Sequence, residues 1–316
     1  MKGVQILGDI TSPKITTTTS LTRPVPKNAE ILVRVYAAGV TGDEVLWPEL
    51  YQTATRIPGH EISGVIAALG PDYDGSLEIG QDVFAFISAD QGQGQAEYAI
   101  CSSNEVAPKP KWISHQEASA LPIPLLTVWE AMVDHSSLKP GMRVLITGAS
   151  GAVGSIAVQL MTQVAGAHVI GLASPRNHGN LRELGAQETF DYNAEGWETS
   201  IDDVDVVFDT VGGEVLKKCW KTVKADSVII TVADPAPNWA FARCRPTESA
   251  SHPGVRYVYF IVSPNSERLS RASQRIDDAS AKPLVVTVFS VDEAAEAWEA
   301  ARQRGRGKKV VISFES

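Results

Sequence analysis

The chain has 316 residues, of which 44% are hydrophobic and 21% charged. These are ordinary values for a globular protein with a packed core. The formal net charge is −9, and an acidic chain repels phosphate backbones, so we expect no nucleic-acid partner. The apolar runs are strand-length, whereas a membrane-spanning helix takes roughly 20 apolar residues, so we expect no membrane span.

Cysteine usage and the start of the chain both predict a cytosolic protein. Cys101, Cys219 and Cys244 form no Cys-x-x-Cys pair, which argues against a disulfide framework and a structural zinc site. Each is expected to be a small buried or half-buried side chain. The first residues lack the long apolar run of a signal peptide.

Residues 13–100 predict an antiparallel, barrel-like β domain. Short apolar or alternating runs, such as Ile31–Tyr36 and Gln81–Phe86, are separated by Gly and Pro. A helix is expected near Gln116–Ala120, where Ser114 and Glu117 fit a capping box.

After Pro140-Gly141, strand patterns alternate with helical ones, which predicts a doubly wound parallel sheet with right-handed crossovers. The tail from about Lys282 predicts a strand, a helix opened by a capping box at Ser290–Glu293 and stopped by Gly305, and a final strand at Lys309–Phe314. The strands expected in the alternating region are 143–147, 168–172, 204–208, 227–232 and 255–262, with an amphipathic helix at 152–164.

The strongest local motif is Gly148-Ala149-Ser150-Gly151-Ala152-Val153-Gly154, between a predicted strand and a predicted helix. Glycine lets a pyrophosphate approach the backbone, and the helix start offers free N–H groups. The motif is not a full Gly-x-Gly-x-x-Gly, because Ser150 occupies one glycine position; the alternative is a ligand-free turn. A nucleophile elbow is disfavoured, because position 152 is Ala and no base is indicated.

The end of the second strand favours NADPH over NADH. An NAD enzyme places Asp or Glu there to bind the ribose hydroxyls. This strand ends in Ala173-Ser174-Pro175-Arg176-Asn177, without an acid. Ser174 and Arg176 suit a 2′-phosphate through charge-assisted hydrogen bonds. The alternative for Arg176 is an exposed arginine at a helix start.

Together these residues resemble a known family. The chain is similar to the zinc-free quinone oxidoreductases and enoyl reductases of the medium-chain dehydrogenase/reductase superfamily, over nearly its whole length. The segments that carry this resemblance are 38–43, 58–64, 95–98, 117–122, 126–129, 148–154, 184–186 and 207–213.

The resemblance implies an α/β fold with a GroES-like β-barrel domain, residues 1–124 and 282–316, and a Rossmann NADPH-binding domain, residues 125–281. It implies NADPH in the intervening cleft. The implied cofactor contacts are Ser150, Gly151, Ala152 and Val153 at the pyrophosphate, Ser174, Arg176 and Tyr192 at the 2′-phosphate, Thr127 at the nicotinamide, Thr210 and Val211 near the ribose, Phe260 and Val262 at the carboxamide, and Lys308. For Lys308 the alternative to a cofactor contact is a solvated basic run with Arg302, Arg304, Arg306 and Lys309.

The same resemblance argues against a metal. Zinc members use a Cys of the first motif, the His of Gly-His-Glu and a later Cys, and a catalytic site needs three such ligands. Here His60 is present, but the first motif reads Val40-Thr41-Gly42-Asp43 and no Cys lies between Cys101 and Cys219. His60 is therefore expected to be a hydrogen-bonded structural residue. Thr41 replaces the Asn of many relatives, and Gly42 is expected to enlarge or reshape the pocket.

The expected reaction is hydride transfer from NADPH to the β-carbon of an α,β-unsaturated carbonyl, or to a quinone. Thr41, Tyr51 and Thr127 are the candidate catalytic residues, with Tyr51 or water as proton donor. Trp47, Tyr51 and Trp239 are candidates for the substrate wall, with ordinary packing as the alternative. The side chains of His115, His135, His168, His178 and His252 are expected to be exposed.

Two alternative functions stay open. One is a biosynthetic enoyl reductase, or an enzyme that repurposes bound NADPH. The other is a non-catalytic cofactor-binding scaffold, because fold does not determine function. The expected partner is a small-molecule substrate. The sequence leaves the oligomeric state open; the resemblance implies a homodimer through the edge strand near Val255–Val262, which would protect that edge.

Overall fold

The computed structural model describes residues 1–303 and 307–315, and the chain divides into two compact units. Unit 1 comprises Met1–Leu126, Ser263–Ala279 and Pro283–Ser316, and unit 2 comprises Thr127–Val262 and Ser280–Lys282. Compared with the predicted 125–281 domain, unit 2 begins at Thr127, lacks residues 263–279 and ends at Lys282. Residues 263–279 belong to unit 1 because their helix packs against a unit 1 strand, Val106–Pro108.

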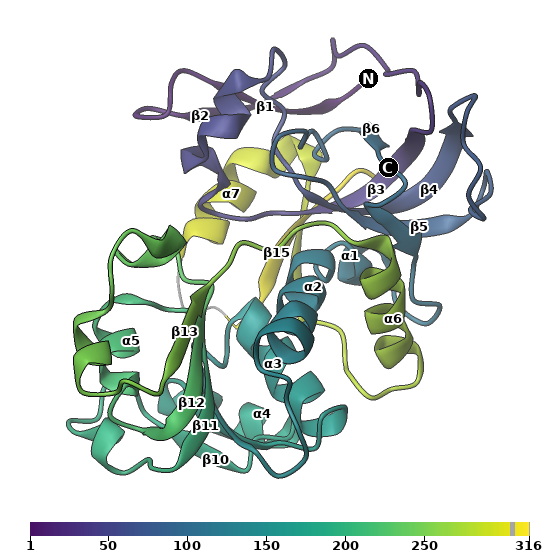
Figure 1. Ribbon diagram of the computed structural model, residues 1–316. Helices are drawn as coiled ribbons and strands as arrows, with labels where there is room; N and C mark the ends of the chain where they lie inside the picture. Colours follow the sequence, from purple (N-terminus) through teal and green to yellow (C-terminus); the bar gives the residue numbers. More distant parts are fainter. Residues whose placement is uncertain (304–306, 316) are drawn as a thin grey trace. The chain divides into compact units, whose positions relative to one another are not determined.

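Unit 1 contains a mixed sheet with the strand order β14-β15-β3-β4-β5-β7, in which β6 also pairs with β3, and a separate hairpin of β1 and β2 (Figure 1). Its strands are β1 (Gly3–Leu7), β2 (Lys14–Thr18), β3 (Ile31–Gly39), β4 (Glu61–Leu69), β5 (Asp82–Phe86), β6 (Tyr98–Cys101), β7 (Val106–Pro108), β14 (Val286–Ser290) and β15 (Lys309–Ser313). Its helices are α1 (His115–Ala118), α6 (Ser266–Asp277) and α7 (Ala294–Arg302).

The pairing in unit 1 is antiparallel as predicted, apart from β14 and β15, which are parallel. These two strands are joined through α7, and a parallel pair needs a crossover connection of this kind. Both predicted capping boxes are confirmed, at Ser114 with Glu117 and at Ser290 with Glu293. The predicted helix stop at Gly305 lies outside the described residues; the last helical residue is Arg302.

Unit 2 is built around a sheet of six strands, all parallel, in the order β10-β9-β8-β11-β12-β13 (Figure 1). This confirms the predicted doubly wound sheet. The strands are β8 (Arg143–Thr147), β9 (His168–Leu172), β10 (Glu188–Phe190), β11 (Val204–Asp209), β12 (Val223–Thr231) and β13 (Arg256–Tyr259). The helices are α3 (Ala152–Gln163), α4 (His178–Glu183) and α5 (Gly213–Cys219), while α2 (Pro122–Glu130) carries the chain from unit 1 into unit 2.

The strand order reverses between β8 and β11. The chain first moves outward from β8 through β9 to β10, and then returns to the other side of β8 with β11. In open parallel sheets, ligands bind beyond the carboxyl ends of the strands at such a switch point. The loop after β8 is the predicted phosphate loop, so the sheet places this loop and the loop after β11 at the switch point.

The predicted strands at 143–147 and 168–172 match β8 and β9. The prediction of a strand over 255–262 is too long, because β13 ends at Tyr259 and the chain passes into unit 1 at residue 263. As the predicted dimer contact requires, β13 is an edge strand. The dimer itself stays a prediction.

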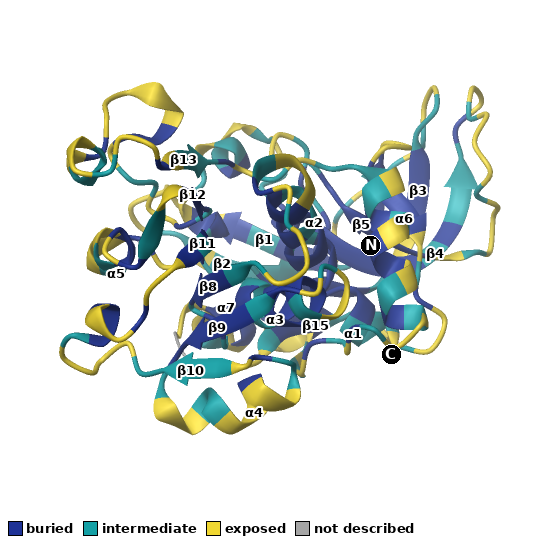
Figure 2. Ribbon diagram, turned by 60° about the horizontal axis from the view of Figure 1, so that its bottom comes forward, coloured by how far each residue is buried: buried dark blue, intermediate teal, exposed yellow. Residues whose placement is uncertain are grey.

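Burial explains why these patterns fold as they do. In Figure 2 the central strands β8, β9 and β11 are coloured as buried, whereas α4 carries a largely exposed outer surface. The core of unit 2 includes Trp197, Trp220 and Trp239, and that of unit 1 includes Trp298 of α7. Among the helices of the described residues, none is long and apolar enough to span a membrane.

Candidate functional site

The glycine loop after β8 is formed by close backbone approach. Gly148 has φ +59°, and a Cβ there would overlap Thr210 Oγ1. A Cβ on Gly154, in the first turn of α3, would overlap the carbonyl oxygen of Gly148. The loop therefore needs glycine at both positions, because the strand end, the loop after β11 and the helix start are in contact.

The start of α3 presents the anion-binding features expected from the sequence. Gly151 is its N-cap, and no side chain caps the helix. The first N–H groups of a helix lack intrahelical partners and lie at the positive end of its dipole. Gly151 is exposed, and Ser150, Ala152 and Val153 are partly exposed. A loop without side-chain bulk before an uncapped helix fits a pyrophosphate.

A second polar group lies at the carboxyl ends of β9 and β10. The Ser174 hydroxyl donates to the hydroxyl oxygen of Tyr192 over 3.4 Å. The hydrogen bond from Ser174 is the largest of the effects that lower the pKa of Tyr192, and the charge of Arg176 acts in the same direction. Arg176 is exposed, in the short 3-10 helix Pro175–Asn177. The structure thus places together the three residues predicted for the 2′-phosphate.

The residues predicted near the ribose lie at the switch point of the sheet. Thr210 donates its hydroxyl to the carbonyl oxygen of Thr147 over 2.9 Å, which ties the loop after β11 to the end of β8. Val211 is 37% exposed, beside Gly148. The sequence analysis assigned no role to Asp209, although a carboxylate at the end of a buried apolar strand was a readable signal.

Of the three other contacts predicted in unit 2, two are buried and one is partly exposed. Thr127 lies in α2 and is 3% exposed. Phe260 is buried, with its ring centroid 4.7 Å from that of His135, and its N–H donates to the carbonyl oxygen of Thr231. Val262 is partly exposed. Their roles stay predictions.

Trp239 belongs to the core of unit 2, where it is 9% exposed and packs edge-on against Tyr257 at a centroid distance of 5.3 Å. Such a buried ring contributes mainly packing area. This geometry favours the packing alternative over a place in the substrate wall.

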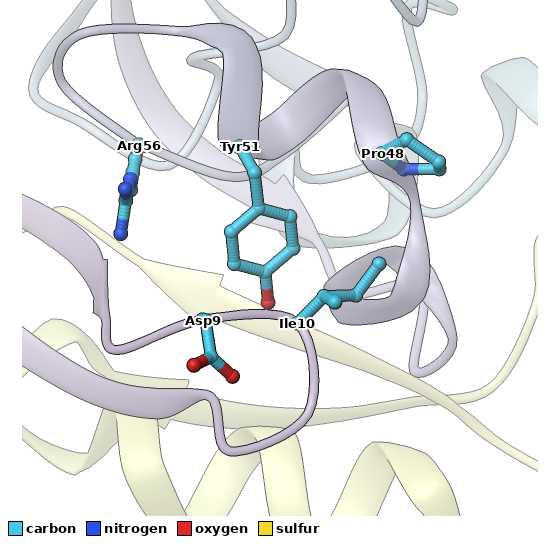
Figure 3. A pocket seen from close by; sticks show the side chains of 5 residues that line it. All are labelled: Asp9, Ile10, Pro48, Tyr51 and Arg56. Carbon is cyan, nitrogen blue, oxygen red and sulfur yellow. The ribbon is translucent and has the colours of Figure 1, made fainter.

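The remaining predicted residues, Thr41, Trp47, Tyr51 and Lys308, belong to unit 1. Tyr51 lines a small surface pocket with Asp9, Ile10, Pro48 and Arg56, and Figure 3 shows its ring between Arg56 on one side and Pro48 on the other. The Tyr51 hydroxyl donates to the carbonyl oxygen of Val45 over 2.7 Å, and desolvation raises the pKa of Tyr51. The hydroxyl proton of Tyr51 is thus engaged by the backbone, and the role of Tyr51 as proton donor stays a prediction. Lys308 is exposed and Thr41 partly exposed.

Gly42 does not enlarge a pocket, contrary to our expectation. A Cβ at Gly42 would lie 2.5 Å from the carbonyl oxygen of Ala301 and close to the backbone of Arg302. The space that a side chain would fill is occupied by the carboxyl end of α7. Glycine at this position serves close packing within unit 1.

His60 is a buried, fully hydrogen-bonded side chain. Its Nδ1 lies 3.1 Å from the carbonyl oxygen of Ile87 and 3.2 Å from that of Ser88. Its Nε2 lies 3.3 Å from a carboxylate oxygen of Glu44, which also accepts the N–H of Gly59. Since both ring nitrogens face acceptors, the geometry favours the doubly protonated ring. Desolvation lowers the pKa of His60, but Glu44 and the hydrogen bonds outweigh it, so the pKa of His60 is raised.

We expect the replacement Glu44→Gln to lower the pKa of His60, because it removes the facing negative charge while keeping the side-chain shape. NMR titration of the His60 ring in both proteins measures this directly. A raised histidine pKa stabilises the fold below the ordinary value of 6.5, and this contribution is lost as pH rises through the folded value. An unchanged pKa of His60 in Glu44→Gln would contradict the assigned pair.

Glu61, the residue after His60, forms a buried ion pair that the sequence analysis missed. Its carboxylate is 1% exposed and lies 2.5 Å from the Nζ of Lys309 in β15. The other carboxylate oxygen accepts the N–H of Ile123 over 2.9 Å. Between the two strands, Gly39 of β3 leaves room, since a Cβ there would lie 3.1 Å from the Glu61 carboxylate. The Lys309 side chain is 12% exposed and paired with Glu61, so Lys309 is no part of a solvated basic run.

Two further expectations are wrong. The side chains expected to be exposed are all partly buried instead; they are those of His115, His135, His168, His178 and His252. In His115, Nδ1 is 2.8 Å from the Ser63 hydroxyl and Nε2 is 3.6 Å from Asp82, with the side chain 13% exposed. The helix start that carries it packs against β3 and β4, which buries the ring. Cys244 is exposed, whereas Cys101 and Cys219 are buried as expected.

Two family models match this chain, one within unit 1 and the other across parts of both units. Residues 27–111 match the model of the alcohol dehydrogenase GroES-like domain, and residues 184–312 match that of the zinc-binding dehydrogenases. The quinone oxidoreductase from Coxiella burnetii has a similar structure, with a TM-score of 0.82 and 26% identity over 100% of both chains. The chain belongs to the medium-chain dehydrogenase/reductase superfamily, in its zinc-free branch of quinone oxidoreductases and enoyl reductases.

Two curated relatives bear on the chemistry. The NAD(P)H oxidoreductase RTN4IP1, mitochondrial, of Danio rerio is 29% identical over 90% of this chain and 84% of its own length. The 2-methylene-furan-3-one reductase of Solanum lycopersicum is 31% identical over 81% of this chain and 63% of its own length. The match to the GroES-like domain model and the structural similarity to the Coxiella burnetii enzyme confirm the expected α/β fold, with a GroES-like and a Rossmann part.

The cytosolic location expected from the sequence is wrong by the same comparison. The Danio rerio relative and its counterparts in Mus musculus and Homo sapiens are all named mitochondrial, as is a relative from Arthroderma benhamiae. Composition and cysteine usage indicate only that a compartment is reducing, so they did not identify the compartment.

The residues present do not fit the zinc named in one family description. Both nitrogens of His60 have partners other than a metal, and Cys101 is a core residue of unit 1. Among residues 1–303 and 307–315, no three His, Cys, Asp or Glu side chains are gathered as metal ligands.

Proposed function

We propose that this protein is an NADPH-dependent reductase of activated C=C bonds in α,β-unsaturated carbonyl compounds, or of quinones, acting without zinc. The observation that carries the proposal is the arrangement in unit 2: an uncapped glycine loop and, at the ends of the neighbouring strands, the group of Ser174, Arg176 and Tyr192. The relatives' names, which include an NAD(P)H oxidoreductase, support the nicotinamide cofactor.

The 2′-phosphate is the group that these residues suit. The guanidinium of Arg176 provides a charge, and the hydroxyls of Ser174 and Tyr192 provide hydrogen bonds. A carboxylate at the end of β9 would repel a phosphate, and residues 173–177 contain none. The cofactor, when bound, supplies a hydride, and this chain's residues bind and orient it.

Two arguments support this substrate class: the residues around His60 do not fit a zinc ion, and the relatives' names include conjugated substrates. Without a bound Lewis acid, an alkoxide is hard to stabilise, whereas a conjugated acceptor delocalises the arriving charge. The 2-methylene-furan-3-one reductase and the quinone oxidoreductase among the similar proteins act by name on conjugated substrates. Both observations favour C=C bonds or quinones over simple alcohols.

The replacement Arg176→Ala is expected to weaken NADPH binding by about tenfold or more and to leave NADH binding nearly unchanged, because only NADPH carries the extra phosphate. Fluorescence titration with each dinucleotide measures this. Arg182→Ala is the matched control, because Arg182 on α4 contacts Thr189 rather than Ser174 or Tyr192. Equal affinity of the wild-type protein for NADPH and NADH would overturn the preference.

Turnover separates the remaining alternatives. NADPH oxidation is followed at 340 nm (a property of the reduced nicotinamide ring) with enones, enals, quinones and simple aldehydes, and products are identified by mass. Reduction of the conjugated substrates supports the proposal. Tight NADPH binding without oxidation by any of them would instead support a non-catalytic scaffold.

A further inference from the structure

The carboxylate of Asp209 is completely buried at the carboxyl end of β11 and is surrounded by hydrogen-bond donors. The hydroxyls of Thr147 and Thr231 each donate to it over 2.6 Å. The backbone N–H groups of Val211 and Gly212 donate to it over 3.0–3.2 Å. Because a carboxylate has about four acceptor sites, this set of donors satisfies it.

The two threonines extend the network to the loops beyond the sheet. Thr147 Oγ1 accepts the N–H of Thr210 over 3.0 Å, and Thr231 Oγ1 accepts the N–H of Ala233 over 3.2 Å. Each hydroxyl therefore donates to Asp209 and accepts from a loop. Thr147, Asp209 and Thr231 are the last residues of β8, β11 and β12, which are neighbours in the sheet.

This network lies against the glycine loop. Thr210 donates its hydroxyl to the carbonyl oxygen of Thr147, the residue before Gly148, and a Cβ on Gly148 would overlap Thr210 Oγ1. The positions of Thr210 and Val211 beside the glycine loop are therefore set by hydrogen bonds that converge on one carboxylate. A completely buried carboxylate needs hydrogen-bond donors that are held in place around it, because a buried polar group without partners costs free energy.

We propose that Asp209 is a positioning residue for the dinucleotide site, which holds the loops after β8, β11 and β12 in the geometry that binds the cofactor. The proposal rests on the proposed function, because it assigns the cofactor to the glycine loop. Asp209 acts through Thr147, Thr231 and the backbone of residues 210–212, and its own carboxylate contacts no ligand.

The replacement Asp209→Asn tests this with little change of shape. The amide presents an NH₂ group where one carboxylate oxygen accepts hydrogen bonds. This NH₂ group would then face the threonine hydroxyls and backbone N–H groups, which are themselves donors. We expect the dissociation constant for NADPH to rise about tenfold or more, by analogy with the loss of a charged hydrogen bond. Thr231→Val should have the same effect, and Thr231→Ser, which keeps the hydroxyl, should restore affinity close to that of the wild type.

Asp205→Asn is the matched control in the same strand. Like Asp209, Asp205 has a carboxylate that accepts hydrogen bonds, in this case from the N–H of Arg143 over 2.8 Å and from Lys224 over 2.6 Å. Asp205, however, lies at the amino end of β11. Thermal unfolding is measured for every variant, and titrations are made well below each melting temperature. Asp205→Asn is expected to lower the melting temperature without changing the NADPH affinity.

The outcomes are distinct. A wild-type protein that binds no nicotinamide dinucleotide overturns the proposed function itself. A wild type that binds NADPH, together with Asp209→Asn and Thr231→Val variants of unchanged affinity, overturns only the positioning role. Equal weakening in Asp205→Asn and Asp209→Asn also overturns it, because the effect would then follow stability alone. Should Asp209→Asn fail to fold, the comparison of Thr231→Val with Thr231→Ser decides.

Discussion

The replacement Lys309→Met is expected to destabilise the protein by about 3–5 kcal/mol at neutral pH. It leaves the carboxylate of Glu61, which is 1% exposed, without its only cationic hydrogen-bond partner among the described residues. Methionine has nearly the volume of the lysine stem, so little of the loss comes from a cavity. Chemical denaturation gives the free energy of unfolding, and Lys308→Met is the control, because the neighbouring Lys308 is exposed.

The pH dependence of this loss has a defined sign. Desolvation raises the pKa of Glu61 above 4.5, and Lys309 opposes that rise. Without Lys309 the pKa of Glu61 rises further, so the folded state keeps its proton to a higher pH than the unfolded state. The penalty is therefore smallest below pH 4.5 and grows as pH rises through the folded value. A penalty that is independent of pH, or equal to that of Lys308→Met, would refute the assignment.

The replacement Gly154→Ala is expected to destabilise the protein by about 1–3 kcal/mol or more and to weaken cofactor binding. Its Cβ would overlap the backbone oxygen of Gly148 and approach the Cα of Ala149. Because these are backbone atoms, no rotamer change relieves the contact. Either α3 or the glycine loop must move, and both belong to the proposed pyrophosphate site.

Gly179→Ala is the matched control for this prediction. Gly179 lies in α4, and a Cβ there meets nothing within 4 Å. Alanine at an unobstructed helical position is expected to stabilise the protein by about 0.5–1 kcal/mol, because glycine loses more backbone entropy on folding. Thermal unfolding and NADPH titration are measured for both variants. Similar behaviour of the two would show that close packing at Gly154 is not what the site requires.

Local patterns predicted much of the fold. The bounds of β8 and β9, both capping boxes and the glycine loop were readable because each depends on residues within a few positions of one another. The group at the second strand end was also predictable: Ser174 and Arg176 follow one strand directly, and the resemblance added Tyr192. Their mutual contact came from the pairing of β9 with β10.

What the sequence by itself determined was the order of the elements and the type of loop, because hydrophobic period, caps and glycines act locally. Only the tertiary structure decided the partners of the buried charges. Glu61 and Lys309 are 248 positions apart, and Asp209 is 62 positions from Thr147. Such pairs are chosen by strand order and burial, which bring distant residues into a medium where a charge must find a partner.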